Sequence, residues 1–105
     1  HAAFDRTNSV AARVRDALAR GIVEQPDVAG QMGLSVATLR RRLSDEGLKF
    51  RDLREEVLND AAKRLLLEGR SVSDIADTLG FSEARAFNRA FKDWNGVTPK
   101  AFVKQ

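Results

Sequence analysis

The sequence predicts an all-α fold of about seven helices, arranged as two small helical subdomains joined by one long linker helix. Apolar residues recur at spacings of three and four in every segment of useful length, whereas the apolar-polar alternation of strands is missing. Residues that favour the starts and ends of helices stand between these segments. With 105 residues, the chain has room for a single domain of this kind, residues 1–105, and not for a second large one.

The first subdomain is expected over about residues 9–48. Ser9 is placed to cap a first helix whose apolar residues recur at spacing four, and Gly21 suits the left-handed residue beyond its end. Pro26 then favours the first turn of a second, short helix that runs to about Met32.

A third helix is expected over about residues 35–46, with Ser35 as its cap and Gly47 as its end. The linker helix follows over about 50–68, where Gly69 ends it. Its apolar residues form two neighbouring stripes, Phe50, Leu53, Val57, Ala61 and Leu65 and, beside them, Leu58, Ala62 and Leu66.

The second subdomain is expected over about 71–104. Ser71, with an acidic residue three positions later, has the pattern of a capping box at the start of a short helix. A longer helix follows over about 82–94, and Thr98 with Pro99 combines a cap with a first-turn proline for a closing helix.

An internal repeat is the most informative feature of the chain. Residues 28–35 recur as residues 75–82, a shift of 47 (82 minus 35), and the shift becomes 48 downstream, where Arg41 matches Arg89. One residue has therefore been added between the second turn and its helix. Each copy has a short helix, a glycine-containing turn and a longer helix, which is the composition of a helix-turn-helix, whose second helix enters the DNA major groove.

The longer helix of each copy has an apolar face and an opposite face that is cationic or hydrogen-bonding. Arg41 lies opposite the apolar face of the first helix, and Arg89 takes the same position in the second. A run such as 40–42, three consecutive arginines, is most often a solvated helix surface. An outward arginine repeated in both copies favours nucleic-acid binding instead.

The linker helix has a length that suits this function. About 19 residues at 1.5 Å each are about 28 Å long, close to the roughly 34 Å turn of B-DNA. One chain could therefore fill two successive major grooves.

Composition excludes several other classes of function. The chain has no cysteine, which rules out disulfides, thiolate metal sites and a cysteine nucleophile, and a reducing cytosol is expected. Its only histidine is His1, at the N-terminus, which argues against a catalytic triad or a histidine metal cluster. No phosphate-binding glycine loop and no membrane-length apolar run occur. We expect no enzyme, cofactor, metal or membrane partner.

Residues 80–99, GFSEARAFNRAFKDWNGVTP, resemble the C-terminal signature of AraC/XylS transcription regulators, and residues 32–47, MGLSVATLRRRLSDEG, resemble the first unit of that family. The resemblance covers about residues 26–102. It implies a bacterial DNA-binding domain with two helix-turn-helix units on one linker helix, attached in longer regulators to an N-terminal sensing or dimerisation domain. The chain is accordingly expected to be a monomeric fragment of a longer cytoplasmic, nucleoid-associated protein that binds double-stranded promoter DNA and RNA polymerase.

The resemblance also implies site residues. Matching positions carry the family's base-reading role to Ala37, Arg40, Arg41, Ala84, Arg85, Asn88 and Arg89. The expected phosphate contacts, at or near the starts of the capped helices, are Ser35, Thr38, Ser82, Lys92 and Lys100. For Ser35 and Ser82 a role as helix cap is equally consistent. The chain departs from the family at Leu58 and Asn88, where members frequently carry Arg and Ser.

Two other classes of function stay open at this point. The arginine faces could contact protein, which would make the chain a helical interaction module for RNA polymerase or another regulator. A domain of this type can also be fused to DNA-repair methyl transfer, although the absence of cysteine argues against that chemistry within this chain.

Overall fold

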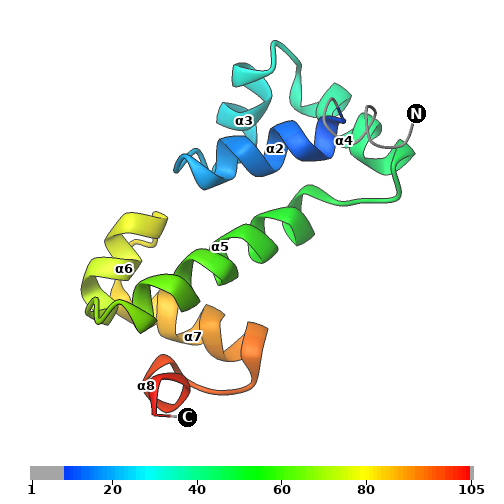
Figure 1. The fold of residues 1–105 in the computed structure, drawn as a ribbon. Helices are drawn as coiled ribbons and strands as arrows, with labels where there is room; N and C mark the ends of the chain where they lie inside the picture. The colour runs from blue at the N-terminus through cyan, green and yellow to red at the C-terminus, as the bar shows by residue number, and fades with distance from the viewer. Residues whose placement is uncertain (1–8, 105) are drawn as a thin grey trace. The chain divides into compact units, whose positions relative to one another are not determined.

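The computed structural model describes residues 9–104, which form seven α-helices and no strands (Figure 1). The prediction of an all-α fold is confirmed. The helices belong to two compact units, one ending at Val57 and the other beginning at Leu58. His1 lies outside the described residues.

Among the described residues, the first unit contains three helices and the start of a fourth. They are α2 (Val10–Ala19), α3 (Gln25–Gln31), α4 (Val36–Asp45) and the first turns of α5 (Phe50–Leu67). The helices α2, α3 and α4 pack against one another pairwise. Their buried side chains, together with one from α5, form a single apolar core that includes Val14, Leu18, Val28, Leu39, Leu43 and Leu53.

Local hydrogen bonds define the helix starts in this unit as predicted. The Ser9 side chain accepts a hydrogen bond from the Ala12 N–H, and the Ser35 side chain accepts one from the Thr38 N–H, each at 3.1 Å. In the turn between α3 and α4, Gly33 has a φ of 70°, a conformation that glycine adopts without steric cost.

Two long-range polar contacts hold the start of α5 to the rest of the first unit. The Arg15 Nε lies 2.9 Å from the Glu56 Oε2, and the Arg54 Nε donates a 3.0 Å hydrogen bond to the Val23 carbonyl. Because Val23 lies in the connection between α2 and α3, Arg54 joins that connection to α5.

The second unit contains the last turns of α5 together with α6 (Val72–Leu79), α7 (Ala84–Asn95) and α8 (Pro99–Val103). Among the described helices, α6 and α7 form the most extensive pair (Figure 1). The Ser71 and Thr98 side chains each accept a hydrogen bond from a backbone N–H three residues later, at 3.1 Å. These two predicted caps are confirmed.

The predicted cap of α7, Ser82, is wrong by one residue. The helix begins at Ala84, and its cap position is Glu83, whose side chain makes no capping hydrogen bond. The one-residue insertion in the second copy of the repeat explains the difference. It places Ser82 in the turn, so that Glu83 takes the position that Ser35 has in the first unit.

Aromatic side chains fill the core of the second unit. Phe87 and Phe91 are fully buried, with ring centroids 5.8 Å apart. Phe81 packs edge-on against Phe87 at 5.6 Å, and Phe102 of α8 does the same to Phe91. Trp94 is half-buried, with its ring centroid 6.3 Å from that of Phe81, so it packs at the edge of this core.

The two predicted apolar stripes of α5 are buried to different extents. Residues Leu58, Ala62 and Leu66 of the second stripe are buried, whereas the first stripe, apart from Leu53, is half-buried. With 1% of its surface exposed, Leu58 is a core residue, and its apolar side chain has no donor to offer a phosphate. No helix in the described part of the chain, α5 included, is long and apolar enough to cross a membrane.

Candidate nucleic-acid interface

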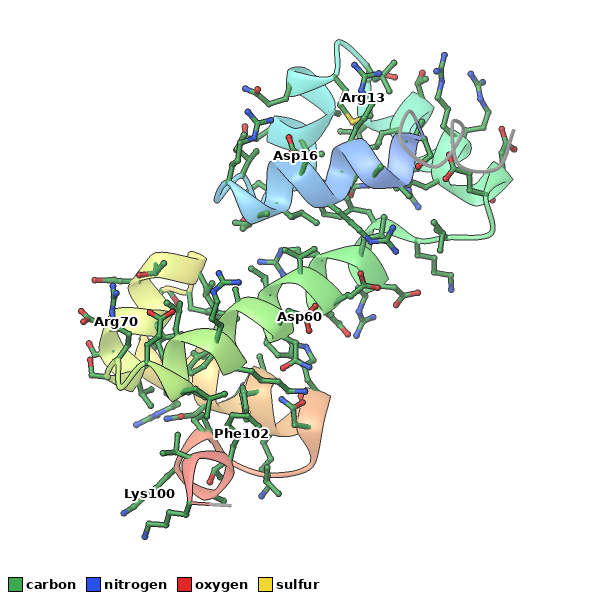
Figure 2. The ribbon with its side chains drawn as sticks, in the orientation of Figure 1. Arg13, Asp16, Asp60, Arg70, Lys100 and Phe102 are labelled. Atoms are coloured by element: carbon green, nitrogen blue, oxygen red, sulfur yellow. The ribbon has the colours of Figure 1, made fainter. Side chains whose placement is uncertain are left out.

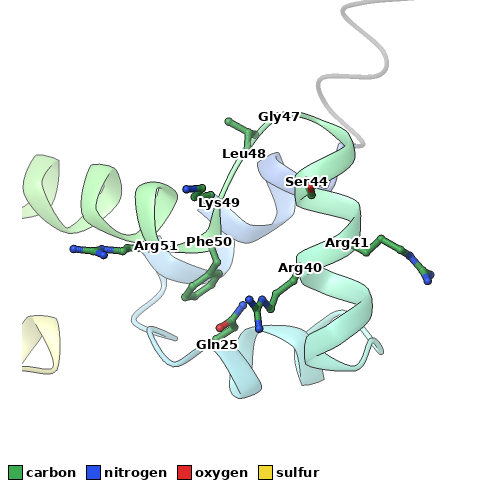
Figure 3. Close-up of a pocket in the computed structure, with 9 residues that line it drawn as sticks. All are labelled: Gln25, Arg40, Arg41, Ser44, Gly47, Leu48, Lys49, Phe50 and Arg51. Atoms are coloured by element: carbon green, nitrogen blue, oxygen red, sulfur yellow. The ribbon is translucent and has the colours of Figure 1, made fainter.

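The recognition helix of the first unit, α4, separates its apolar and polar residues as predicted. Leu39 and Leu43 are completely buried, whereas Ala37, Arg40 and Arg41 are exposed. Figure 3 shows the Arg41 side chain pointing away from the body of the unit. Packing of the apolar face thus forces this guanidinium into solvent, where it is available to a ligand.

The start of α4 carries two hydroxyl groups that hydrogen-bond to each other. Besides capping the helix, the Ser35 hydroxyl donates a 2.9 Å hydrogen bond to the Thr38 Oγ1. The Ser35 hydroxyl proton is therefore used within the helix. The Thr38 hydroxyl has accepted a bond but retains its own proton, and a phosphate oxygen could accept it.

The second recognition helix, α7, presents a longer row of polar groups. Its buried residues are Phe87 and Phe91, and the predicted site residues on its exposed surface are Arg85, Asn88, Arg89 and Lys92. Ala84 is half-buried on the inner side of the first turn, where it offers a ligand less surface than Ala37.

The remaining predicted site residues lie outside the two recognition helices. Ser82 is exposed in the turn before α7, and Lys100 is exposed on the second residue of α8. All twelve predicted residues therefore have some exposed surface, and six of them, at positions 82–92, share one turn and helix in the second unit.

The cations of the two recognition helices have no acidic partner among the described residues. The ion pairs of this part of the chain are Arg15–Glu56, Arg20–Asp16, Arg51–Glu55 and Arg70–Asp74. Asp16 and Arg70, which belong to two of them, are labelled in Figure 2. Arg41, Arg89 and Lys92 are absent from these pairs, so their charges are free to meet phosphates or the acceptor edge of guanine.

One concave surface of the first unit joins residues that sequence reasoning did not connect. Gln25 of α3, Arg40 and Ser44 of α4, and Lys49 and Phe50 at the start of α5 are among its lining residues (Figure 3). No motif links Gln25 to Arg40, which are fifteen positions apart (40 minus 25) on different helices. The predictions missed Gln25 and Lys49 for this reason.

Comparison with known proteins identifies the class to which this fold belongs. A model of the family described as "Helix-turn-helix domain" matches residues 28–105. An uncharacterized HTH-type transcriptional regulator of Mycobacterium tuberculosis is 37% identical over 105 residues, which cover 96% of this chain and 30% of that protein. The regulator VirS of the same species is 42% identical over 76 residues, 71% of this chain and 22% of VirS. The chain thus spans less than a third of the length of either relative.

Solved structures have the same fold. The C-terminal domain of AraT, a response regulator from Geobacillus stearothermophilus, aligns with a TM-score of 0.79 and 25% identity, covering 90% of this chain and 84% of that one. A DNA-binding transcriptional dual regulator from Escherichia coli aligns with a TM-score of 0.81 and 21% identity, covering 91% and 90% of the two chains.

The fold and the two exposed recognition helices define a helix-turn-helix DNA-binding domain of the kind found in transcription regulators. More particularly, the chain belongs to the AraC-type helix-turn-helix family, as its resemblance predicted. The family and the relatives are transcription regulators rather than enzymes, in line with the prediction.

Proposed function

We propose that this chain binds promoter DNA sequence-specifically, with α4 and α7 in successive major grooves on one face of the duplex. The observation that carries the proposal is the duplicated unit itself. It places Arg41 and Arg89 at equivalent positions on two recognition helices, and both are exposed and unpaired among the described residues. A single helix-turn-helix with one arginine would be a weaker basis for this function.

Arginines dominate the proposed base readout. Arg41, Arg85 and Arg89 have the length and donor geometry for bidentate contact with guanine, worth about 1–3 kcal/mol of discrimination per base. Asn88 suits adenine, and the methyl groups of Ala37 and Ala84 can contact thymine methyl groups.

The proposed phosphate contacts hold each helix in its groove. The groups in this role are the hydroxyls of Ser35, Thr38 and Ser82 and the ammonium groups of Lys92 and Lys100. Because the Ser35 hydroxyl proton is used within α4, we expect Thr38 to be the stronger phosphate donor of this pair.

The length of the connecting helix supports binding at two sites. The helix α5 has 18 residues and is therefore about 27 Å long, comparable with the roughly 34 Å turn of B-DNA.

The full protein would act in the bacterial cytoplasm at the nucleoid and contact RNA polymerase, and a further N-terminal domain would dimerise it. This fragment alone would be a monomer, which light scattering can measure.

Selection of bound sequences from a random DNA pool tests the proposal. We expect two short sequence blocks spaced about one helical turn apart. Arg41→Ala should relax the sequence preference of one block, and Arg89→Ala should relax that of the other. A single block, or two blocks that both variants leave unchanged, would contradict the bipartite readout.

Salt dependence distinguishes this function from a protein-interaction module. If the chain neutralises phosphates, the logarithm of the association constant falls linearly with the logarithm of salt, with a slope of about −0.9 per phosphate contact. An interface with RNA polymerase built mainly from apolar contacts would respond far less to salt.

A further inference from the structure

The concave surface beside α4 has features that the base-reading role does not explain. It has a volume of about 890 Å³ and lies between the first residue of α3, one flank of α4 and the link from α4 to α5. Four of its lining residues are cations, Arg40, Arg41, Lys49 and Arg51, and none is a carboxylate. Its electrostatic character is therefore that of an anion-binding surface.

The two neighbouring arginines of α4 at this surface, Arg40 and Arg41, point in different directions. Figure 3 shows the Arg40 guanidinium turned toward the Gln25 side chain, below the Phe50 ring, whereas Arg41 points away from them. A rotation of about 100° per residue explains this difference, since it places Arg40 on the flank of the helix and Arg41 at the centre of its outer face. The two arginines consequently present their donors in different directions.

From this difference we infer that the surface formed by Gln25, Arg40 and Lys49 binds the DNA sugar-phosphate backbone, and that Arg40 binds phosphate rather than a base. We call this surface the seat. The inference rests on the proposed function. A helix in the major groove has a phosphate strand along each side, so a cationic flank meets backbone while the outermost residue meets base edges. Arg40 supplies a planar fork of donors, Gln25 a neutral amide donor, and Lys49 a point charge at the rim.

The charges of the seat are available for this contact. Arg40 and Lys49 make no ion pair among the described residues, whereas Arg51 already pairs with Glu55, 3.2 Å away. The Lys49 carbonyl accepts hydrogen bonds from the Asp52 and Leu53 N–H groups, which holds the Lys49 backbone at the start of α5. The seat therefore belongs to Arg40, Gln25 and Lys49, and Arg51 contributes less.

The test is a set of salt titrations of the whole chain on its selected DNA and on a scrambled duplex, between about 50 and 200 mM KCl. We expect Arg40→Gln and Lys49→Gln each to reduce the magnitude of the salt slope by about 0.9, with equal fractional losses of affinity on both duplexes. Gln25→Ala should lower affinity several-fold without changing the slope, because it removes a neutral donor. Arg41→Gln should instead weaken the selected sequence more than the scrambled one.

Arg13→Gln is the matched control, since Arg13 is an exposed cation of the same unit, on α2, that makes no ion pair among the described residues (Figure 2). It should leave the slope nearly unchanged. Each variant is first checked for a wild-type circular dichroism spectrum and melting temperature.

Two results would overturn the seat. One is an Arg40→Gln loss confined to the selected sequence, which would make Arg40 a base reader. The other is a salt slope that stays at the wild-type value in both Arg40→Gln and Lys49→Gln, which would show that neither cation neutralises a phosphate. If the unmodified chain binds no DNA in a salt-dependent way, the proposed function itself fails, and that result is distinct from both.

Discussion

Asn59 of α5 and Asn95, the last residue of α7, form a reciprocal pair of amide hydrogen bonds. The Asn95 Nδ2 donates to the Asn59 Oδ1 at 2.8 Å, and the Asn59 Nδ2 donates to the Asn95 Oδ1 at 3.1 Å. The Asn95 Nδ2 also donates to the Phe91 carbonyl, 3.1 Å away. This pair attaches the end of the second recognition helix to α5 within the second unit.

Loss of this pair should destabilise the second unit. Asn95→Ala leaves the half-buried Asn59 amide without its partner, and we expect the free energy of unfolding to fall by about 1–3 kcal/mol. Urea denaturation followed by circular dichroism measures the change. Asn88→Ala, an exposed asparagine on the same helix, is the control, and its effect should stay within about 0.5 kcal/mol. Equal effects of the two substitutions would show that the amide pair contributes nothing specific.

The two serines before the recognition helices should differ in their importance for stability. Ser35 caps α4, so Ser35→Ala should cost about 1 kcal/mol of unfolding free energy. Ser82 does not cap α7, so Ser82→Ala should be close to neutral. Equilibrium denaturation of both variants measures the difference. A larger cost for Ser82→Ala would mean that the turn before α7 depends on this hydroxyl.

Substitution by alanine should change the stability of the chain in opposite directions at two glycines, one in α3 and one in the turn between α3 and α4. Gly30 has a helical position in α3 with open space around a would-be Cβ, so Gly30→Ala should stabilise the chain by about 0.5–1 kcal/mol. Gly33 also has open space, but its φ is 70°, so Gly33→Ala should destabilise the chain by about 1 kcal/mol. Thermal unfolding measures both. A stabilising Gly33→Ala would contradict the backbone argument.

Removal of Arg89 should weaken binding in a sequence-dependent way. We expect Arg89→Ala to cost about 1–3 kcal/mol on the selected site and much less on a duplex changed at the base that Arg89 reads. Fluorescence anisotropy titrations at constant salt provide the measurement. Arg64→Ala, an exposed arginine of α5 outside the recognition helices, is the control. An equal loss for Arg89→Ala on both duplexes would reassign this residue to the phosphate backbone.

The starts of the helices show which local features could be predicted from the sequence. Ser9, Ser35, Ser71 and Thr98 were predicted as caps and are caps, because a cap depends on a side chain and a backbone N–H only three residues apart. The start of α7 was misplaced because Ser82 matches Ser35 in the repeat. The residue added after the turn shifts the cap position to Glu83, whose side chain makes no capping hydrogen bond.

The buried and exposed faces of α4 and α7 could also be predicted from the sequence. A helix repeats every 3.6 residues, so the buried positions Leu39 and Phe87 place the exposed Arg41 and Arg89 without knowledge of any neighbouring helix. The comparisons confirm the family that these patterns indicated.

Periodicity and caps are local properties, and the repeat is read directly from the amino-acid order. These three features were enough to establish the helices, their exposed faces and the family. The Asn59–Asn95 amide pair and the surface shared by Gln25 and Arg40 depend on contacts between separate helices. Their geometry follows from how the apolar cores pack, since packing sets which side chains from distant parts of the chain come within reach of each other. That information is absent from any single stretch of sequence.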